Sequence, residues 1–329
     1  MLLLTRADVR RLVPMPDAVE LMKQAFAELS AGRTASPLRT VIPVREHHGD
    51  ALFMPGHVPA MNALGLKIVS VFRDNPARGL PVINALVAAI DPETGVPMAV
   101  MDGTYLTALR TGAVSGAATD LLARPDSRVL ASIGSGAQGV TQVAAVCAVR
   151  PIERVIQVYR SEDRRAKFAE ALATDWPDLV PLVEYATDAN AAVAQADVVC
   201  AATSARTPVF AAEAVRDGAH VNAVGAYTHE MQELPPSLVA RATVVVDAID
   251  AVLAEAGDLV IPMNEGLFGR DHISRELGDV AAGRAPGRTS ASEITLFKSV
   301  GNSVQDVVVA RRAYDRARAE GVGVDFQFG

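Results

Sequence analysis

The 329-residue chain has few cysteines, no excess of basic residues and no long apolar run. Cys147 and Cys200 have neither a nearby partner nor the spacing of metal ligands, so we expect buried structural thiols. A formal net charge of −7 leaves no basic face for nucleic acid or anionic lipid. No stretch approaches the roughly 20 apolar residues that span a membrane, and the N-terminus lacks the pattern of a signal peptide. We therefore expect a protein of the reducing cytoplasm that binds neither nucleic acid nor membranes.

What the chain does contain is a glycine-rich stretch in the setting of a nucleotide-binding turn. Residues 129–139 have the pattern of a buried strand that leads into Gly134-x-Gly136-x-x-Gly139 and then an apolar helix. In such a fingerprint the first glycine permits a tight turn, the second lets the backbone approach a pyrophosphate, and the third allows close helix–strand packing. The pyrophosphate would lie at the helix N-terminus near Ala137. A purely structural glycine turn is the alternative to the dinucleotide site that this pattern predicts.

Short apolar runs alternate with helical patterns through the middle of the chain. This alternation predicts an α/β fold with a parallel, doubly wound sheet of the Rossmann type. The expected strands are 128–133, 153–159, 182–185, 197–202, 219–224 and 243–247, and the expected helices are 137–149, 162–174, 188–195 and 248–256.

The first 115 residues have a different pattern, which indicates a separate α+β unit. A helix over about 16–31 is followed by extended runs that turn signals separate, so we expect hairpins or a meander. These runs are 38–44, 51–54, 62–72, 82–91 and 98–101. A helix rich in Ala and Gly follows Asp102, and its small residues should let another backbone approach closely. A final amphipathic helix, about 301–320, is expected to pack back on this first unit. We assign 1–115 and 303–329 to one domain and 116–302 to the NAD(P)-binding Rossmann domain.

The second strand of the nucleotide unit ends in Arg160 and Ser161, and Arg164 follows one helical turn later. NAD-specific sites usually place a carboxylate at this strand end, where it accepts hydrogen bonds from the ribose 2′-OH. Arg160 and Arg164 are instead suited to a 2′-phosphate. This favours NADP(H), with NAD(H) as the alternative coenzyme. The competing interpretation is that Arg160 is only solvated and that Glu162 or Asp163 serves the ribose.

Two cations interrupt apolar patterns. Lys67 lies inside an apolar strand pattern, where burial is costly unless the charge meets a partner or an anionic ligand. The alternative is a lysine on an edge strand whose ammonium reaches water. Arg110 interrupts a helix of small residues, where a solvated surface arginine is the usual explanation. Two unpaired cations directed at one cleft would form a carboxylate-binding site, but sequence spacing alone does not decide whether they converge.

These residues fall in motifs through which the chain resembles the ornithine cyclodeaminase/μ-crystallin family. The motifs are Gly65–Ser70, Asp74–Pro81, Asp102–Thr111, Ile133–Gln138, Asn222–Gly225 and Thr295–Gly301. The resemblance implies a homodimer formed through the N-terminal unit and the last helix, so that this domain serves dimerisation and substrate binding. It also implies that Arg39, Lys67 and Arg110 clamp a substrate carboxylate beneath the nicotinamide, and that Thr111, Val224 and Ser299 lie near the coenzyme.

The chain departs from the family pattern at Tyr227. Cyclodeaminases and the related alanine dehydrogenases carry an Asp there that handles the substrate amino group, and a tyrosine cannot replace that carboxylate near neutral pH. Val82 stands where cyclodeaminases tend to have Thr, with Asn84 nearby as a polar contact to substrate. These departures make the chain similar to the cyclic-ketimine reductases, oxidoreductases of proline metabolism that act on CH–NH bonds. Such enzymes use NAD(P)H to reduce Δ1-pyrroline-2-carboxylate or Δ1-piperideine-2-carboxylate to L-proline or L-pipecolate.

Three other functions stay open at the level of the sequence. One is ornithine cyclodeaminase, which converts ornithine to proline and ammonia with bound NAD. The others are an amino-acid dehydrogenase and a non-catalytic, NADP-dependent binding protein like μ-crystallin. In the reductase interpretation the imine nitrogen needs a proton, which Lys67, Thr228, His229 or an ordered water can supply; a surface location for His229 is equally compatible with the sequence.

The predicted site residues fall into a substrate set and a coenzyme set, with Lys67 and Arg110 as the catalytic pair. The substrate set is Arg39, Lys67, Asn84, Arg110, Thr228 and His229. The coenzyme set is Thr111, Gly134, Ser135, Gly136, Ala137, Gln138, Tyr159, Arg160, Ser161, Arg164, Thr203, Val224, Gly225 and Ser299. His47, His48 and His57 lack metal-ligand spacing, so we expect no metal site.

Overall fold

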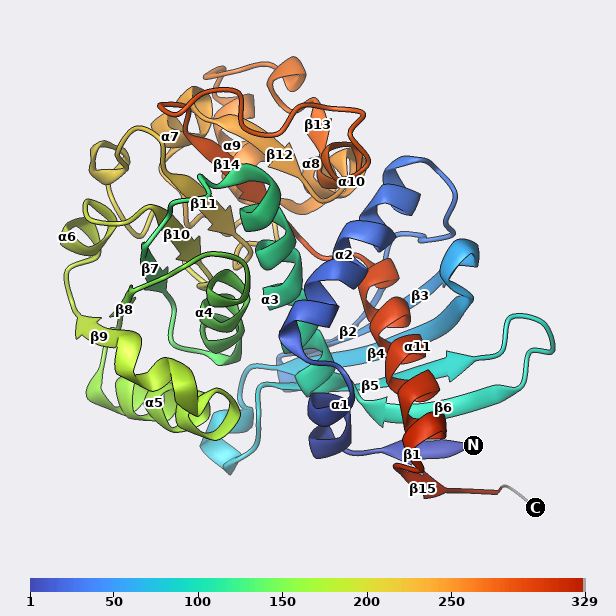
Figure 1. Ribbon diagram of the computed structural model, residues 1–329. Coiled ribbons are helices and arrows are strands. Elements are labelled where there is room, and N and C mark those ends of the chain that lie inside the picture. The colour runs from blue at the N-terminus through green and yellow to red at the C-terminus, as the bar shows by residue number, and fades with distance from the viewer. Residues whose placement is uncertain (328–329) are drawn as a thin grey trace. The chain divides into compact units, whose positions relative to one another are not determined.

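The computed structural model describes residues 1–327, which form two compact units (Figure 1). Unit 1 comprises Met1–Arg110 and the described residues from Asn302 onward, and unit 2 comprises Thr111–Gly301. The boundaries expected from the sequence, 115/116 and 302/303, differ from these by five residues and by one. The functions assigned to the two parts stay predictions. Among the described helices, none combines the length and apolar character that a membrane span requires.

Unit 2 contains an eight-stranded sheet in the order β13-β12-β14-β11-β10-β7-β8-β9. The strands are β7 (Val129–Ile133), β8 (Arg154–Val158), β9 (Val183–Ala186), β10 (Val198–Ala201), β11 (His220–Ala223), β12 (Thr243–Val246), β13 (Arg275–Glu276) and β14 (Thr295–Lys298). All neighbouring pairs in this sheet run parallel. The chain builds outward from β7 through β8 and β9, then returns to place β10 on the other side of β7. This reversal is the topological switch point of a doubly wound fold, as the sequence predicted.

The six predicted strands are present, each within one residue of its expected ends. The sequence analysis missed β13 and β14, although β14 lies inside the sheet between β11 and β12. Strand β14 has only four residues and begins and ends with the polar residues Thr295 and Lys298. A run this short and polar carries no recognisable period.

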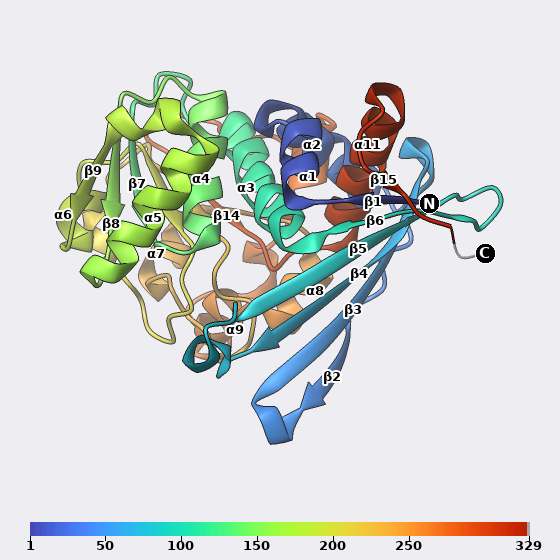
Figure 2. The ribbon, with the colours of Figure 1, turned by 90° about the horizontal axis from the view of Figure 1, so that it is seen from below.

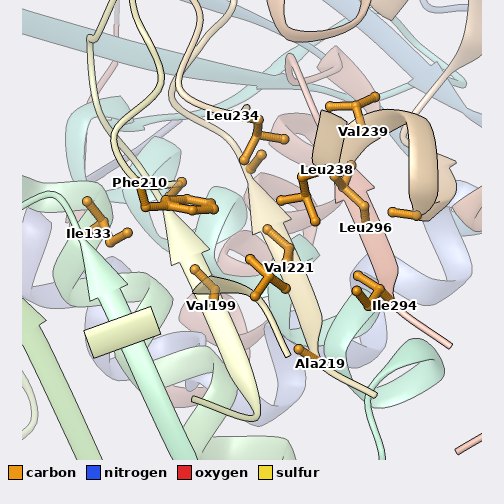
Figure 3. Packing of buried hydrophobic residues seen from close by; sticks show 14 of the residues in the cluster. Ile133, Val199, Phe210, Ala219, Val221, Leu234, Leu238, Val239, Ile294 and Leu296 are labelled. Carbon is orange, nitrogen blue, oxygen red and sulfur yellow. The ribbon is translucent and has the colours of Figure 1, made fainter. Parts of the chain in front are cut away.

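Helices cover both faces of this sheet, so most residues of its strands are buried. The helices of unit 2 are α4 (Ala137–Val149), α5 (Glu162–Asp175), α6 (Ala189–Val193), α7 (Pro236–Arg241), α8 (Ile249–Glu255), α9 (Gly257–Asn264) and α10 (Leu277–Ala281), together with the second half of α3 (Gly103–Leu122). One apolar cluster includes Val199, Phe210 and Val221 (Figure 3). A second includes Leu130 of β7 and Phe168 of α5.

The small residues of α3 allow close packing within unit 2, as predicted. A Cβ added to Gly112 would lie 2.5 Å from the carbonyl oxygen of Thr141 on α4. The amide of Gln142 also donates to the carbonyl of Thr111 at 3.2 Å. The two helix backbones are therefore in direct contact.

Unit 1 contains a seven-stranded sheet in the order β15-β1-β6-β5-β4-β3-β2. Its strands are β1 (Leu2–Leu4), β2 (Thr40–Val44), β3 (Gly49–Val58), β4 (Ala63–Phe72), β5 (Ile83–Ile90), β6 (Pro97–Asp102) and β15 (Val324–Asp325). Strands β2 to β6 form an antiparallel meander, which confirms the predicted connections. Strand β1, which the sequence analysis missed, pairs in parallel with β6.

Three helices of unit 1, α1 (Arg6–Leu12), α2 (Met15–Ser30) and α11 (Ser303–Glu320), lie on one face of this sheet (Figure 2). Helix α11 contacts β3, β4 and β5, so the last helix packs on the first unit as predicted. Two glycines allow it to lie close to the strands. A Cβ on Gly56 would lie 3.1 Å from the carbonyl oxygen of Ser303, and one on Gly65 would lie 3.3 Å from Cγ1 of Val307. The first turns of α11 are therefore fully buried.

Candidate active site

Lys67 is a buried lysine on an interior strand of unit 1. Strand β4 lies between β3 and β5, and Lys67 pairs in register with Met54 and Val87. The side chains of Met54 and Val87 are buried on the face that the helices cover. Lys67 itself is 1% exposed. The alternative of an edge-strand lysine that reaches water is therefore wrong.

Lys67 and Arg110 converge on a buried carboxylate, Asp306 of α11. The ammonium of Lys67 lies 2.8 Å from Oδ2 of Asp306, and Nε of Arg110 donates to Oδ1 at 3.0 Å. Arg110 is 6% exposed, so the alternative of a solvated surface arginine is also wrong. The sequence left open whether the two cations are paired and whether they converge; in the structure each pairs with Asp306.

The N-terminus of α11 fixes the guanidinium of Arg110 from a second side. Asn302 caps the helix, and its backbone N–H donates to Oε1 of Gln305 at 2.9 Å in a capping box. The same Oε1 accepts a hydrogen bond from Nη1 of Arg110 at 2.7 Å. Arg110 is thus held by two consecutive residues of one helix.

The surroundings of Lys67 make its proton labile. Burial and the positive charges of Arg110 and Arg39 lower the pKa of Lys67 from 10.5 to about 7, while Asp306 acts in the opposite direction. Near neutral pH the ammonium and the free amine are therefore both populated. A buried lysine in this state can hold an anion and can also transfer a proton.

The other two predicted substrate residues of unit 1, Arg39 and Asn84, differ in their position relative to Lys67. Arg39 is half-buried just before β2, and its charge reaches Lys67. Asn84 pairs with Ser70, three residues from Lys67 on β4, and side chains alternate between the faces of a sheet. Asn84 therefore projects from the opposite face to Lys67, and its amide donates to the carbonyl of Pro81 at 3.2 Å. The structure does not bring Asn84 to the cationic pair.

Asp306 belongs to the candidate site, and the sequence analysis missed it. It shares a stripe of α11 with Ala310, Ala313 and Ala317, all of them buried. A carboxylate on the apolar stripe of a helix is as anomalous as a lysine in an apolar strand. That shared anomaly is the signal that could have linked Asp306 to Lys67.

The predicted coenzyme residues all lie in unit 2, and most follow the carboxyl ends of neighbouring strands. Strands β8, β7, β10, β11 and β14 end in register, at Val158, Ile133, Ala201, Ala223 and Lys298. The predicted residues at this edge are Gly134, Ser135, Gly136, Tyr159, Arg160, Ser161, Thr203, Val224, Gly225 and Ser299. Thr111 lies on α3, Ala137 and Gln138 begin α4, and Arg164 is in the first turn of α5. This edge is where open α/β sheets bind ligands.

The glycine turn after β7 fits a dinucleotide. Gly134 has a φ of 115°, and a Cβ on Gly139 would lie 2.0 Å from the carbonyl oxygen of Gly134. Among the described residues, no heavy atom outside Gly136 and its two chain neighbours lies within 4 Å of a Cβ built on Gly136, and no side chain caps α4. The buried Oε1 of Gln138 has no hydrogen-bond partner among residues 1–327. An open backbone and uncapped N–H groups at the start of α4 together suit a pyrophosphate group.

At the end of β8, Arg160 and Arg164 are exposed, and no carboxylate of the described chain lies within ion-pair distance of either. The nearby acidic residues are already engaged. Glu162 accepts a hydrogen bond from the Tyr159 hydroxyl at 2.8 Å and pairs with Arg165, and Asp163 pairs with Lys167. Ser161 caps α5 through its hydroxyl.

Two buried carboxylates that the sequence did not indicate hold three of the predicted coenzyme residues, Thr203, Gly225 and Ser299. Glu233 accepts hydrogen bonds from the backbone N–H and the hydroxyl of Thr203, at 2.9 and 3.1 Å. Asp247 accepts one from the hydroxyl of Ser299 at 2.7 Å. Glu233 and Asp247 are fully buried. Their signal in the sequence is weak, because each acts on a residue tens of positions away.

Position 227 carries no carboxylate, and Tyr227 packs against the first apolar cluster of unit 2. His229 is exposed and Thr228 is half-buried. Cys200 is buried and Cys147 is half-buried, and burial raises the pKa of each thiol to about 12. In the part of the chain that the structure describes, no group of three or more His, Cys, Asp or Glu residues is placed to hold a metal ion.

The chain is similar to known proteins over its whole length. Residues 1–321 match the ornithine cyclodeaminase/mu-crystallin family. A Δ1-pyrroline-2-carboxylate reductase of Bacillus cereus is 42% identical over 329 residues, which cover 100% of both chains.

Solved structures are similar over the same length. The Thermococcus litoralis Δ1-pyrroline-2-carboxylate reductase in complex with NADH and L-proline has 40% identity and a TM-score of 0.93, and the match covers 99% of this chain and 100% of that one. An archaeal alanine dehydrogenase dimer with bound NAD has 35% identity and a TM-score of 0.91, over 100% and 99% of the two chains.

Proposed function

Because the chain belongs to the ornithine cyclodeaminase/mu-crystallin family, we propose that it is an NAD(P)H-dependent reductase of cyclic imino acids. It reduces Δ1-pyrroline-2-carboxylate or Δ1-piperideine-2-carboxylate to L-proline or L-pipecolate. The full-length similarity to Δ1-pyrroline-2-carboxylate reductases supports this reaction. Tyr227 in place of an acidic residue supports it over the cyclodeaminase reaction, which needs a carboxylate for the substrate amino group.

The observation that carries the proposal is the convergence of Lys67 and Arg110 in unit 1. Two buried cations share one carboxylate, so the cluster they form with Asp306 keeps an excess positive charge. The charge of Arg39 also acts on Lys67. A substrate carboxylate balances the excess charge, and arginine presents a planar fork that suits carboxylate oxygens. We assign Lys67, Arg110 and Arg39 to binding this group.

The residues at the carboxyl edge of the unit 2 sheet would hold the coenzyme. Gly134, Gly136 and the N-terminus of α4 suit the pyrophosphate, and Thr203, Val224 and Gly225 follow the strands on the other side of the switch point. When bound, the reduced coenzyme would supply the hydride for the imine carbon. The protein contributes orientation, which is worth up to ~7–11 kcal/mol of the barrier when two reactants are held at near-attack distance.

Lys67 is the residue that we assign as the proton donor to the imine nitrogen. With a pKa of about 7, its ammonium releases a proton far more readily than an ordinary lysine does. The negative charge of a bound substrate favours the ammonium form, so the proton is present when the substrate arrives. His229 is exposed and Thr228 is not acidic near neutral pH, which favours Lys67 over both.

NADPH is the preferred coenzyme in this proposal, with NADH as the alternative. Arg160 and Arg164 are exposed at the end of β8, while Glu162 and Asp163 already pair with basic residues of α5. Charges arranged in this way favour a 2′-phosphate over a free ribose hydroxyl.

We also propose a homodimer that forms through unit 1. The helices of that unit cover one face of its sheet (Figure 2). The other face carries partly exposed apolar side chains. Ile42 is 50% exposed and Leu86 is 40% exposed, with Phe53 and Ile68 half-buried beside them. Apolar side chains that gather on one exposed face mark an interaction surface. Sedimentation analysis of Leu86→Glu beside the wild type tests this, since loss of the dimer is the expected result and an unchanged dimer contradicts it.

Steady-state kinetics of the purified chain with both cyclic imino acids tests the proposed function. Lys67→Ala and Arg110→Ala should raise KM for the imino acid sharply and leave the Kd of NADPH nearly unchanged. Unchanged kinetics in either variant would rule out its role in binding the carboxylate.

A further inference from the structure

Unit 2 contains a second buried charged cluster, formed by Glu233, Asp258 and Lys298, that the proposed reaction does not use directly. All three side chains are fully buried. The ammonium of Lys298 lies 2.8 Å from Oδ2 of Asp258 and 4.0 Å from Oε1 of Glu233. Oδ1 of Asp258 accepts hydrogen bonds from the backbone N–H groups of Glu233 and Leu234, at 2.7 and 2.9 Å. The cluster therefore fixes both the side chain and the backbone of Glu233.

The carboxylate of Glu233 connects the loops that follow two neighbouring strands. Oε2 accepts hydrogen bonds from the N–H and the hydroxyl of Thr203, after β10. Oε1 accepts them from the N–H groups of Gly225 and Ala226, after β11, at 2.7 and 3.3 Å. Burial raises the pKa of Glu233, while Lys298 and these N–H donors act in the opposite direction. One side chain thus satisfies four donors from two loops.

The two loops are also in direct contact, which makes their spacing rigid. A Cβ on Gly225 would lie 2.1 Å from the carbonyl oxygen of Thr203 and 2.5 Å from Oε2 of Glu233. Only glycine fits between this carbonyl and this carboxylate. A shift of the Glu233 carboxylate therefore moves both loops together.

These loops lie at the part of the sheet edge where the nicotinamide half of a dinucleotide is expected. A doubly wound sheet binds the two halves of its ligand on opposite sides of the switch point, and that point lies between β7 and β10. The glycine turn after β7 and the residues after β8 serve the ADP-ribose half. The nicotinamide half would then lie over the carboxyl ends of β10 and β11.

We propose that Glu233 is a positioning residue, whose buried carboxylate fixes the loops after β10 and β11 for the nicotinamide half of the coenzyme. The inference rests on the proposed function, because it takes the chain to bind NAD(P)H. It assigns Glu233 no contact with the substrate. Asp258 and Lys298 act through Glu233 by holding it in place.

The test compares Glu233→Gln with a matched control, Asp197→Asn. Asp197 is also a buried carboxylate that accepts two backbone N–H groups, from Arg128 and Val129, but it lies at the opposite, amino-terminal edge of the same sheet. Both substitutions keep the size of the side chain and remove its charge. Both should lower the thermal stability, so a loss of stability alone does not distinguish them.

The readout is the affinity of each full-length variant for NADH and for ADP-ribose, which lacks the nicotinamide. Glu233→Gln should weaken NADH binding by about tenfold and leave ADP-ribose binding unchanged, because the amide NH2 opposes the N–H donors of one loop. Its kcat should fall on the order of 10²-fold, as misplacement of a reactant by about 1 Å does. Asp197→Asn should leave the ratio of the two affinities as in the wild type.

Equal losses of NADH and ADP-ribose affinity in Glu233→Gln, or unchanged NADH affinity and kcat, would overturn the inference. If Glu233→Gln does not fold, Asp258→Asn serves instead, since it releases the backbone of Glu233, and it should change the affinity ratio in the same direction. A wild-type chain that binds NADH but reduces no cyclic imino acid would refute the proposed function, while the binding comparison would still decide the role of Glu233.

Discussion

Replacing Asp306 by Asn removes a carboxylate on which two buried cations converge. Its oxygens lie 2.8 Å from Nζ of Lys67 and 3.0 Å from Nε of Arg110, and Asp306 is fully buried. Removal of one partner from a buried ion pair costs about 3–5 kcal/mol in the free energy of unfolding. The lowered pKa of Lys67, from 10.5 to about 7, corresponds to a penalty of about 5 kcal/mol on its charged form. Without Asp306 that penalty grows, so the pKa of Lys67 falls further.

Urea denaturation and the pH profile of kcat/KM measure these two consequences. Asp315→Asn is the matched control, because Asp315 lies on the same helix and pairs with Arg311 at the surface. Such an exposed pair is worth about 0–1 kcal/mol. Asp306→Asn should lose several times more stability than the control, and its activity should decline at a lower pH than that of the wild type. Equal losses in the two variants, with an unmoved pH profile, would refute the account of the cluster.

Further substitutions test single residues. Gly139→Ala should abolish coenzyme binding in a titration, because the added Cβ would lie 2.0 Å from the carbonyl oxygen of Gly134; retained affinity would contradict the close packing. In the wild type, kcat/KM should decline as pH rises through about 7, where Lys67 loses its proton, and this inflection should vanish in Lys67→Arg, since arginine does not titrate there. Relative to Lys67→Met, wild-type stability should rise between pH 7 and 10.5, where only the unfolded lysine keeps its proton, and a flat difference in urea melts across that range would count against the lowered pKa. Arg160→Ala should weaken NADPH binding and leave NADH binding unchanged, and equal losses for both would exclude a contact with the 2′-phosphate.

Local patterns predicted the elements that lie around the candidate coenzyme site. The apolar runs of β7 to β12 and the glycine turn between β7 and α4 are short-range features. Gly134 has a positive φ, Gly139 makes a close contact, and the Cβ position of Gly136 is open. Strand β14 was missed because its four residues begin with Thr295 and end with Lys298. Lys298 is buried only because Asp258, 40 positions away, pairs with it.

Long-range pairing explains what the sequence could not predict about the candidate site. Lys67 and Arg110 were recognised as anomalous, but spacing along the chain did not show that they meet. Their common partner, Asp306, lies 196 positions beyond Arg110 and is brought there by the packing of α11 on the sheet. Asn84 was predicted to share a substrate site with the two cations, but the alternation of side chains along a strand places it on the other face of the sheet. Whether it contacts substrate stays a prediction.

The most direct test of the central claim measures two reactions of the purified chain side by side. One is the oxidation of NADPH in the presence of Δ1-pyrroline-2-carboxylate, and the other is the release of ammonia from L-ornithine in the presence of NAD. Rapid, substrate-dependent loss of NADPH without ammonia release is the predicted result, because Lys67 and Arg110 are present and position 227 is a tyrosine. Ammonia and proline from ornithine would show that another group replaces the missing carboxylate, and would contradict the assignment as a reductase.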